Sequence, residues 1–123
     1  MELPFIQSIV AEWAASQSLI RRAWLYGSRV RGTHRIDSDI DVAVEVDRLP
    51  QDDTEWGTFM WVSDGLLQSL ELALPLQVDL QFYGGSIETP TIHSGLEHSS
   101  ILAYERNETM PMSFAASSSP FGR

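Results

Sequence analysis

The sequence contains neither cysteine nor lysine. The absence of cysteine excludes disulfide bonds, thiolate metal sites and thiol nucleophiles. The absence of lysine excludes a Schiff base and the lysine of a Walker A loop. No stretch approaches the roughly 20 apolar residues that a membrane-spanning helix needs, and the N-terminus lacks the early positive charge of a secretory signal. We therefore expect a cytoplasmic protein that does not associate with membranes.

Positive charge is also scarce, because the sequence has eight arginines and 17 acidic residues, which gives a formal net charge of −9. A chain this acidic is not expected to bind nucleic acid directly. Five arginines nevertheless share one segment without an acidic residue, and the planar guanidinium group suits phosphate. They are Arg21, Arg22, Arg29, Arg31 and Arg35. On charge alone, this segment is either a site for a small anion or a solvated basic turn.

The length and composition indicate one packed domain. The chain has 123 residues, of which 43% are apolar, so it can bury a core but is too short for two ordinary domains. We predict that the domain spans residues 1–106. Residues 107–123 are rich in serine, alanine and proline, and we predict that they form a flexible tail.

The spacing of apolar residues predicts the helices. Spacings of three and four residues predict helices over residues 4–18 and 53–70, the second capped by Asp52 or Asp53. Residues 91–106 are predicted to be mostly helical. The polar segment between residues 27 and 37 is predicted to be a loop that holds at most one helical turn, closed by a glycine.

Alternation of apolar and polar residues predicts strands over residues 40–46 and 77–83, and a short apolar run predicts a buried strand over residues 23–26. Each alternating strand has one apolar and one polar face. A sheet built from them carries helices on the apolar face and leaves the other face comparatively open. We expect the open face to display three carboxylates together, those of Asp39, Asp41 and Asp79.

The first two of these carboxylates are close in sequence. Asp39 and Asp41 lie roughly 7 Å apart along an extended strand and point to the same side. Such carboxylates repel each other unless a cation lies between them, and Mg²⁺ binds one or two carboxylates together with water and substrate phosphates. Asp79 would allow a second ion. For Asp39 and Asp41 alone, a merely solvated acidic face remains an equal alternative.

A glycine turn precedes the acidic strand. Gly27 and Ser28 follow the predicted apolar strand, and a glycine there lets the backbone approach a ligand closely. The N–H groups of the next turn and the Ser28 hydroxyl can bind a phosphate. Arg29 and Arg31 are predicted to contact phosphate because of their charge and their position. A Gly–Ser dipeptide alone is an ordinary turn, but this one precedes Asp39 by only ten residues.

Together these motifs resemble the signature of the DNA polymerase beta-like nucleotidyltransferase superfamily. The signature comprises LYGS at residues 25–28, DID at residues 39–41 and VDL at residues 78–80. The stretch from residue 26 to residue 44 is similar to the minimal nucleotidyltransferases, a small prokaryotic branch. The resemblance runs from about residue 6 to residue 106. It implies an α+β fold, with a mixed β-sheet, helices packed on one face and an open catalytic face.

The resemblance also implies a reaction, the transfer of a nucleoside monophosphate to a hydroxyl group with release of pyrophosphate. It implies that Asp39 and Asp41 bind two Mg²⁺ ions, and that Asp79 binds the catalytic ion and helps to activate the hydroxyl. Gly27 and Ser28 would hold the triphosphate. Minimal nucleotidyltransferases of this kind act as antitoxins that transfer AMP from ATP to a tyrosine of an all-helical HEPN toxin.

Two alternative functions stay open. The protein could be a non-catalytic antitoxin that masks its partner by contact, or a nucleotidyltransferase that acts on a small hydroxylated molecule. A chain of this length is expected to lack a second domain for an acceptor, so a partner or a homo-oligomer would have to supply that surface. Aromatic residues of the 53–70 helix are candidates for the interface, although core packing is their expected role. They are Trp56, Phe59 and Trp61.

Overall fold

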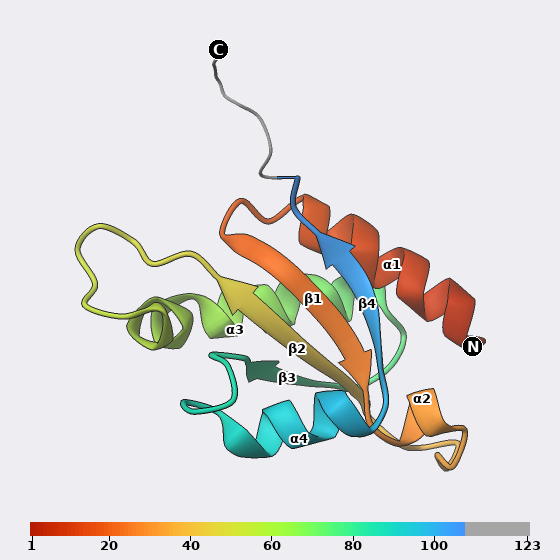
Figure 1. The fold of residues 1–123 in the computed structure, drawn as a ribbon. Coiled ribbons are helices and arrows are strands. Elements are labelled where there is room, and N and C mark those ends of the chain that lie inside the picture. The colour runs from red at the N-terminus through yellow and green to blue at the C-terminus, as the bar shows by residue number, and fades with distance from the viewer. Residues whose placement is uncertain (108–123) are drawn as a thin grey trace, which may run out of the picture.

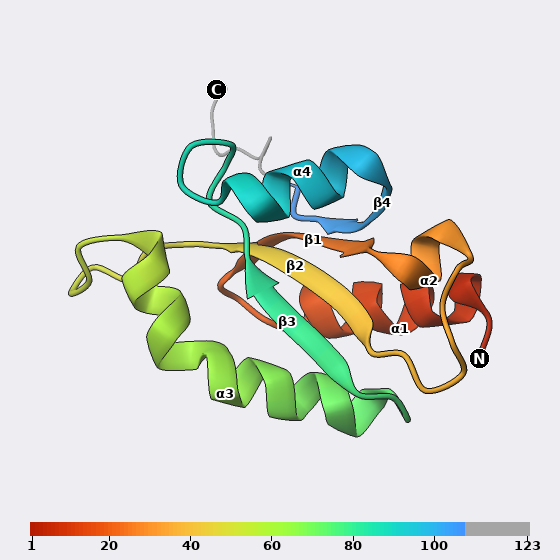
Figure 2. The same ribbon diagram turned by 90° about the horizontal axis from the view of Figure 1, so that it is seen from below.

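The computed structural model describes residues 1–107, which form a four-stranded sheet with helices on both faces (Figures 1 and 2). No helix in this part of the chain is long and apolar enough to cross a membrane. The elements in chain order are α1 (Leu3–Ala15), β1 (Ile20–Tyr26), α2 (Ser28–Arg31), β2 (Ile40–Val46), α3 (Glu55–Ala73), β3 (Val78–Phe82), α4 (Pro90–His98) and β4 (Ser100–Glu105).

The sheet is mixed, with the strand order β3-β2-β1-β4. Strand β1 is antiparallel to both β2 and β4, whereas β2 and β3 are parallel. The three strands predicted from the sequence are present, and β1 is longer than expected because it begins at Ile20. The prediction of an α+β fold with a mixed sheet is therefore confirmed.

The positions of α3 and α4 follow from this topology. Because β4 is antiparallel to β1, it runs in the same direction as β2 and β3, so α3 and α4 each connect two parallel strands. Such crossovers are almost always right-handed. The two crossovers travel in opposite directions across the sheet and must lie on opposite faces. Figure 2 shows α4 on one face and α1 and α3 on the other, so the face that was expected to be open is partly covered.

The hydrophobic core lies between the sheet and helices α1 and α3. The apolar side chains of β2 alternate as predicted, and Ile40, Val42, Val44 and Val46 are all buried. Helix α1 is joined to α3 by a hydrogen bond of 2.8 Å that Trp13 Nε1 donates to Ser69 Oγ. This core fixes the strands whose opposite face carries the polar residues.

The prediction that residues 91–106 are mostly helical is wrong for the second half of this range. Helix α4 ends at His98, and residues Ser100–Glu105 form β4 at the edge of the sheet. The apolar run from Ile101 to Tyr104 is too short for its period to distinguish strand from helix. Pairing with β1, far earlier in the chain, decides its conformation. Apart from Asn107, the predicted tail lies outside the described residues.

The helix ends differ in detail from the prediction. Helix α1 ends at Ala15 rather than at residue 18. The N-cap of α3 is Thr54, whose Oγ1 accepts a hydrogen bond of 3.0 Å from Gly57 N, and not Asp52 or Asp53. Asp52 instead accepts a 2.6 Å hydrogen bond from Thr58 Oγ1. The glycine that closes the short turn α2 is confirmed, because Gly32 is its C-cap with φ 77°.

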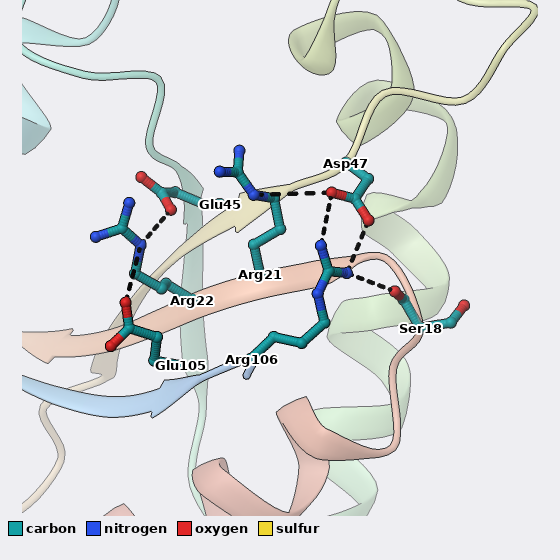
Figure 3. Close-up of polar contacts among 7 residues, drawn as sticks. All are labelled: Ser18, Arg21, Arg22, Glu45, Asp47, Glu105 and Arg106. Atoms are coloured by element: carbon teal, nitrogen blue, oxygen red, sulfur yellow. Dashed lines mark hydrogen bonds and ion pairs between the residues drawn. The ribbon is translucent and has the colours of Figure 1, made fainter. Parts of the chain in front are cut away.

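The arginine-rich segment is divided between the two ends of β1, because Arg21 and Arg22 lie at the start of this strand (Figure 3). Arg22 Nε is 2.6 Å from Glu45 Oε1. Arg21 Nε is 3.7 Å from Asp47, and Arg106 donates to both carboxylate oxygens of Asp47 at 2.7 and 3.0 Å. This ion-pair network connects the ends of β1, β2 and β4, far from the glycine turn.

We expect the substitution Asp47→Ala to lower the free energy of unfolding by about 1 kcal/mol, because it removes the bidentate pair with Arg106. Urea denaturation measures the loss. The matched control is Asp37→Ala, because Asp37 pairs with Arg35 at 3.8 Å where both side chains are more than three-quarters exposed. We expect the control variant to keep almost all of its free energy of unfolding. Equal losses in the two variants would show that the network contributes no more stability than an exposed ion pair.

Candidate active site

The side chains of Tyr26, Asp41 and Asp79 lie next to one another on three neighbouring strands, at the edge of the polar face. In the antiparallel pair β1–β2, Tyr26 is the register partner of Asp41. In the parallel pair β2–β3, Asp41 is the register partner of Asp79. Residues in register on neighbouring strands point to the same face. The structure thus brings Asp41 and Asp79, which are 38 positions apart in the sequence, side by side.

Gly27 contacts the Asp41 carboxylate directly. It follows the last residue of β1 with φ 81° and ψ −156°, a conformation that is essentially restricted to glycine. A Cβ atom added at this position would collide with Oδ2 of Asp41. A glycine is therefore required here for two reasons, its backbone conformation and the close approach of the carboxylate.

The Asp41 carboxyl group has an unusual environment. Burial, the negative charges of Asp79 and Asp39 and a hydrogen bond with Asp79 together raise its pKa to about 6, while Arg31 acts in the opposite direction. Gln81 Nε2 donates a 2.8 Å hydrogen bond to Asp79 Oδ1 and so orients the second carboxylate. The pair is held together despite its repulsion, which a bound cation would relieve.

Tyr26 is a site residue to which the sequence analysis assigned no role, although it belongs to the LYGS motif. Burial, together with the charges of Asp41 and Asp79, raises the pKa of its phenol above the usual range, so the phenol stays neutral. Its ring packs against Gly95 of α4, where an added Cβ would lie 3.3 Å from the ring. Tyr26 therefore connects the covering helix to the carboxylate pair.

These residues line a cavity of about 750 Å³ between the sheet and the start of α4. On its inner side the cavity is lined by Tyr26, Gly27, Arg31, Asp41, Asp79 and Gln81. Pockets for small ligands usually range from about 300 to 1,000 Å³. The cavity is large enough for a nucleotide, with the carboxylate pair in its wall.

The other predicted site residues lie around the cavity rather than in its wall. Ser28 opens α2 immediately after Gly27. Asp39 is exposed just before β2, yet it is close enough for its charge to raise the pKa of Asp41. Among the described residues, neither Ser28 nor Asp39 lines the cavity, whereas Arg31 does.

Arg29 is placed differently from the phosphate contact predicted for it. Its side chain is buried, with 7% exposed. Its Nε and Nη2 donate to the carbonyl oxygen of Ser38 at 3.1 and 2.8 Å, and Nη2 also donates to Ile36 O at 3.5 Å. The guanidinium thus ties α2 to the loop that leads to Asp39, and it does not line the cavity. Of the two predicted phosphate-binding arginines, only Arg31 faces the carboxylates.

The donor set agrees with Mg²⁺ in part. Asp41 and Asp79 offer two neighbouring carboxylates, and Mg²⁺ commonly takes one or two carboxylates and completes its shell with water and substrate phosphates. Within residues 1–107, however, no three His, Asp or Glu side chains gather closely enough to hold a metal ion by themselves. The exposed Asp39 is a third carboxylate, close enough for its charge to act on Asp41. The residues therefore fit an ion that is bound together with a phosphate-containing substrate.

Comparisons with known proteins agree on the fold. A search of curated protein sequences finds no match. A crystal structure of a toxin–antitoxin with AMP-PNP is similar at 19% identity and a TM-score of 0.56. A mutant of the toxin–antitoxin MntA–HpeT is similar at 20% identity and a TM-score of 0.58. Both alignments cover 84% of this chain and 76% of the other.

The family comparison covers most of the sequence. Residues 9–109 match the family described as polymerase beta, nucleotidyltransferase. The matched range contains Gly27, the Asp41–Asp79 pair and every strand of the sheet. This chain is accordingly a nucleotidyltransferase and belongs to the polymerase beta nucleotidyltransferase family.

Proposed function

We propose that the protein transfers AMP from ATP to a tyrosine hydroxyl of a cognate HEPN-type toxin and so acts as the antitoxin. The observation that carries the proposal is the Asp41–Asp79 pair, held against Gly27 in a cavity of nucleotide size. The similarity to two toxin–antitoxin structures, one of them with AMP-PNP, supports the setting.

The proposed reaction is a single displacement at phosphorus. The acceptor oxygen attacks the α-phosphorus, the bond between this phosphorus and the oxygen bridging to the β-phosphate breaks, and pyrophosphate leaves with the bond electrons. Asp79 would accept the proton of the attacking hydroxyl, and the hydrogen bond from Gln81 Nε2 to its Oδ1 supports this role by orienting the carboxylate. The hydroxyl thereby becomes a better nucleophile as it approaches phosphorus.

The remaining residues bind and orient the substrate. Asp41 and Asp79, with Asp39 at the edge, would hold Mg²⁺ ions. When bound, these ions would offset the charge of the triphosphate and stabilise the charge on the attacking and leaving oxygens. Gly27, with Ser28 beside it, allows the triphosphate to approach the backbone, and Arg31 adds the positive charge that faces Asp41.

The acceptor reaches the cavity from outside. The described chain forms one sheet with its helices and has no second domain over the cavity. Helix α4 covers part of the polar face, and its first turns contribute to the cavity wall. A partner protein that presents a tyrosine at the remaining opening would complete the reaction site.

The direct test mixes the purified protein with ATP labelled at the α-phosphate, Mg²⁺ and the protein encoded by the adjacent gene. We expect label on a partner tyrosine, and at least a 100-fold loss of transfer in Asp41→Asn and in Asp79→Asn, because each removes one carboxylate of the pair. The matched control is Asp64→Asn, an exposed carboxylate of α3 outside the cavity, which keeps the activity.

Three other outcomes would contradict the proposal. Failure of the wild-type protein to label its partner would exclude the transfer reaction proposed here. Neutralisation of the toxin by Asp41→Asn without nucleotide would show that the antitoxin acts by contact alone. Label on a small hydroxylated compound, with none on the partner, would identify a transferase for small molecules.

A further inference from the structure

An exposed tryptophan rests on buried aromatic rings at one end of the cavity. Trp56 lies in the first turn of α3, and 47% of its surface is exposed. Its ring stacks on Phe59, with centroids 5.9 Å apart and an interplanar angle of 22°, and meets the edge of Phe82 at 5.5 Å. Phe59 and Phe82 are buried. The indole is therefore fixed in orientation while much of it remains available to a ligand.

This aromatic group and the carboxylate pair face the same cavity, which is lined by both Trp56 and Asp79. Strand β3 connects the two ends, because it carries Asp79 near its start and Phe82 at its end. These two residues are three positions apart, so their side chains leave opposite faces of β3, which is an edge strand. The cavity is lined by Asp79, Phe82 and Trp56 and therefore reaches around this edge, from the carboxylates to the indole.

The acidic side chain of Glu88 lines the same hollows as the indole. Glu88 lines the main cavity and also a smaller hollow of about 270 Å³ that it shares with Trp56, Phe82 and Thr89. The loop that carries it is fixed, because Thr89 Oγ1 donates to Gly85 O at 2.9 Å and accepts from Gly84 N at 3.0 Å. A carboxylate next to an aromatic platform can accept a hydrogen bond from an amino group on the edge of a base.

We propose that the nucleobase of the nucleoside triphosphate stacks on Trp56, with Phe59 and Phe82 behind the indole, and that Glu88 accepts a hydrogen bond from the amino group of the base. This role depends on the proposed function, because it requires the triphosphate to lie at Asp41 and Asp79. In this proposal, the first turn of α3 and the loop after β3 recognise the base. The phosphate groups are bound separately by the glycine turn and the carboxylates.

Binding measurements separate the base from the phosphates. Isothermal titration in Mg²⁺ uses two probes, AMP-PNP and inorganic tripolyphosphate, which has no base. We expect Trp56→Ala to weaken AMP-PNP binding about tenfold, the scale of one aromatic–base stack, and to leave tripolyphosphate binding unchanged. Trp56→Phe keeps a ring and should recover most of the affinity. The matched control is Trp61→Ala on the same helix, because Trp61 is 80% exposed and lies outside the cavity.

A second variant tests the acidic side chain. We expect Glu88→Ala, which removes the acceptor, to weaken binding of AMP-PNP, and to leave binding of purine riboside triphosphate unchanged, because that base lacks the amino group. Equal losses for the two nucleotides would exclude the proposed hydrogen bond.

The outcomes distinguish this inference from the function on which it rests. If the wild-type protein binds both probes and Trp56→Ala binds AMP-PNP as Trp61→Ala does, the platform is excluded and the proposed function stands. If Trp56→Ala loses tripolyphosphate and AMP-PNP equally, Trp56 supports the fold rather than the base, and the platform is again excluded. If the wild-type protein binds neither probe, the platform and the proposed function are excluded together.

Discussion

Replacing Gly27 with alanine is expected to reduce nucleotidyl transfer at least 100-fold and to lower the free energy of unfolding by about 2 kcal/mol. The backbone at Gly27 has φ 81° and ψ −156°, which a residue with a Cβ atom adopts only under strain. The added methyl group would also collide with Oδ2 of Asp41 and displace this carboxylate from its position beside Asp79. Urea denaturation and the label-transfer assay measure the two effects.

Gly32→Ala is the matched control for this substitution. Gly32 also has a positive φ, 77°, but it lies in the left-handed helical region, and an added Cβ would meet nothing within 4 Å. We expect it to lose about 1 kcal/mol of stability from backbone strain and to keep its activity. If both variants kept full activity, the close approach of Gly27 to Asp41 would not matter for catalysis.

The metal-free protein is expected to become less stable as the pH rises from about 4 to above 6. The pKa of Asp41 is about 6 in the folded chain and 3.8 in a free side chain, so the folded state binds the proton more tightly. The stabilisation is fully present below pH 4 and is lost as the pH passes through 6. Thermal unfolding in the presence of a chelator measures this dependence.

Asp41→Asn tests the origin of that dependence. Asparagine carries no charge at any pH, so we expect the variant to show a flatter profile and to be more stable than the wild type above pH 6, although we expect it to have lost its activity. Asp64→Asn is the control, because this exposed carboxylate of α3 lies away from the pair and should leave the profile unchanged. A profile in Asp41→Asn as steep as that of the wild type would assign the titration to another group.

Magnesium is expected to reverse the effect of pH on the wild-type protein. A divalent ion binds the deprotonated carboxylates, so protons compete with it at low pH. We expect Mg²⁺ to raise the melting temperature more at pH 7.5 than at pH 5. A carboxylate pair that destabilises the free protein and binds an ion in the active state would exchange stability for function.

Local sequence patterns were sufficient for much of the fold. The alternation of residues 40–46 predicted β2 and its two faces, because the period of two in a strand is set by backbone geometry and not by its neighbours. The same alternation placed Asp41 and Asp79 on polar faces of strands. The glycine turn was also visible, since an apolar strand that is followed by Gly27 and then by arginines is a local signal.

The features that differ from the predictions depend on tertiary contacts. Residues Ser100–Glu105 became β4 because an edge of β1 was available to pair with them. Core packing was the expected role of the aromatic residues of α3, and it is confirmed for Phe59 and wrong for Trp61, which is 80% exposed. The charge and position of Arg29 suggested a phosphate contact. Its guanidinium is instead buried against the carbonyl oxygen of Ser38, in the loop before β2.

The sequence by itself determined which residues have the chemistry for the site, because the choice of carboxylate, glycine or arginine is a property of each position. Tertiary structure decided which of them meet. The register of the parallel pair β2–β3 places Asp79 beside Asp41, and the handedness of the two crossovers sends α4 over the polar face. The tertiary structure also brings Trp56 to the cavity that the carboxylate pair lines. Such proximity depends on contacts between distant segments, which no local pattern of residues encodes.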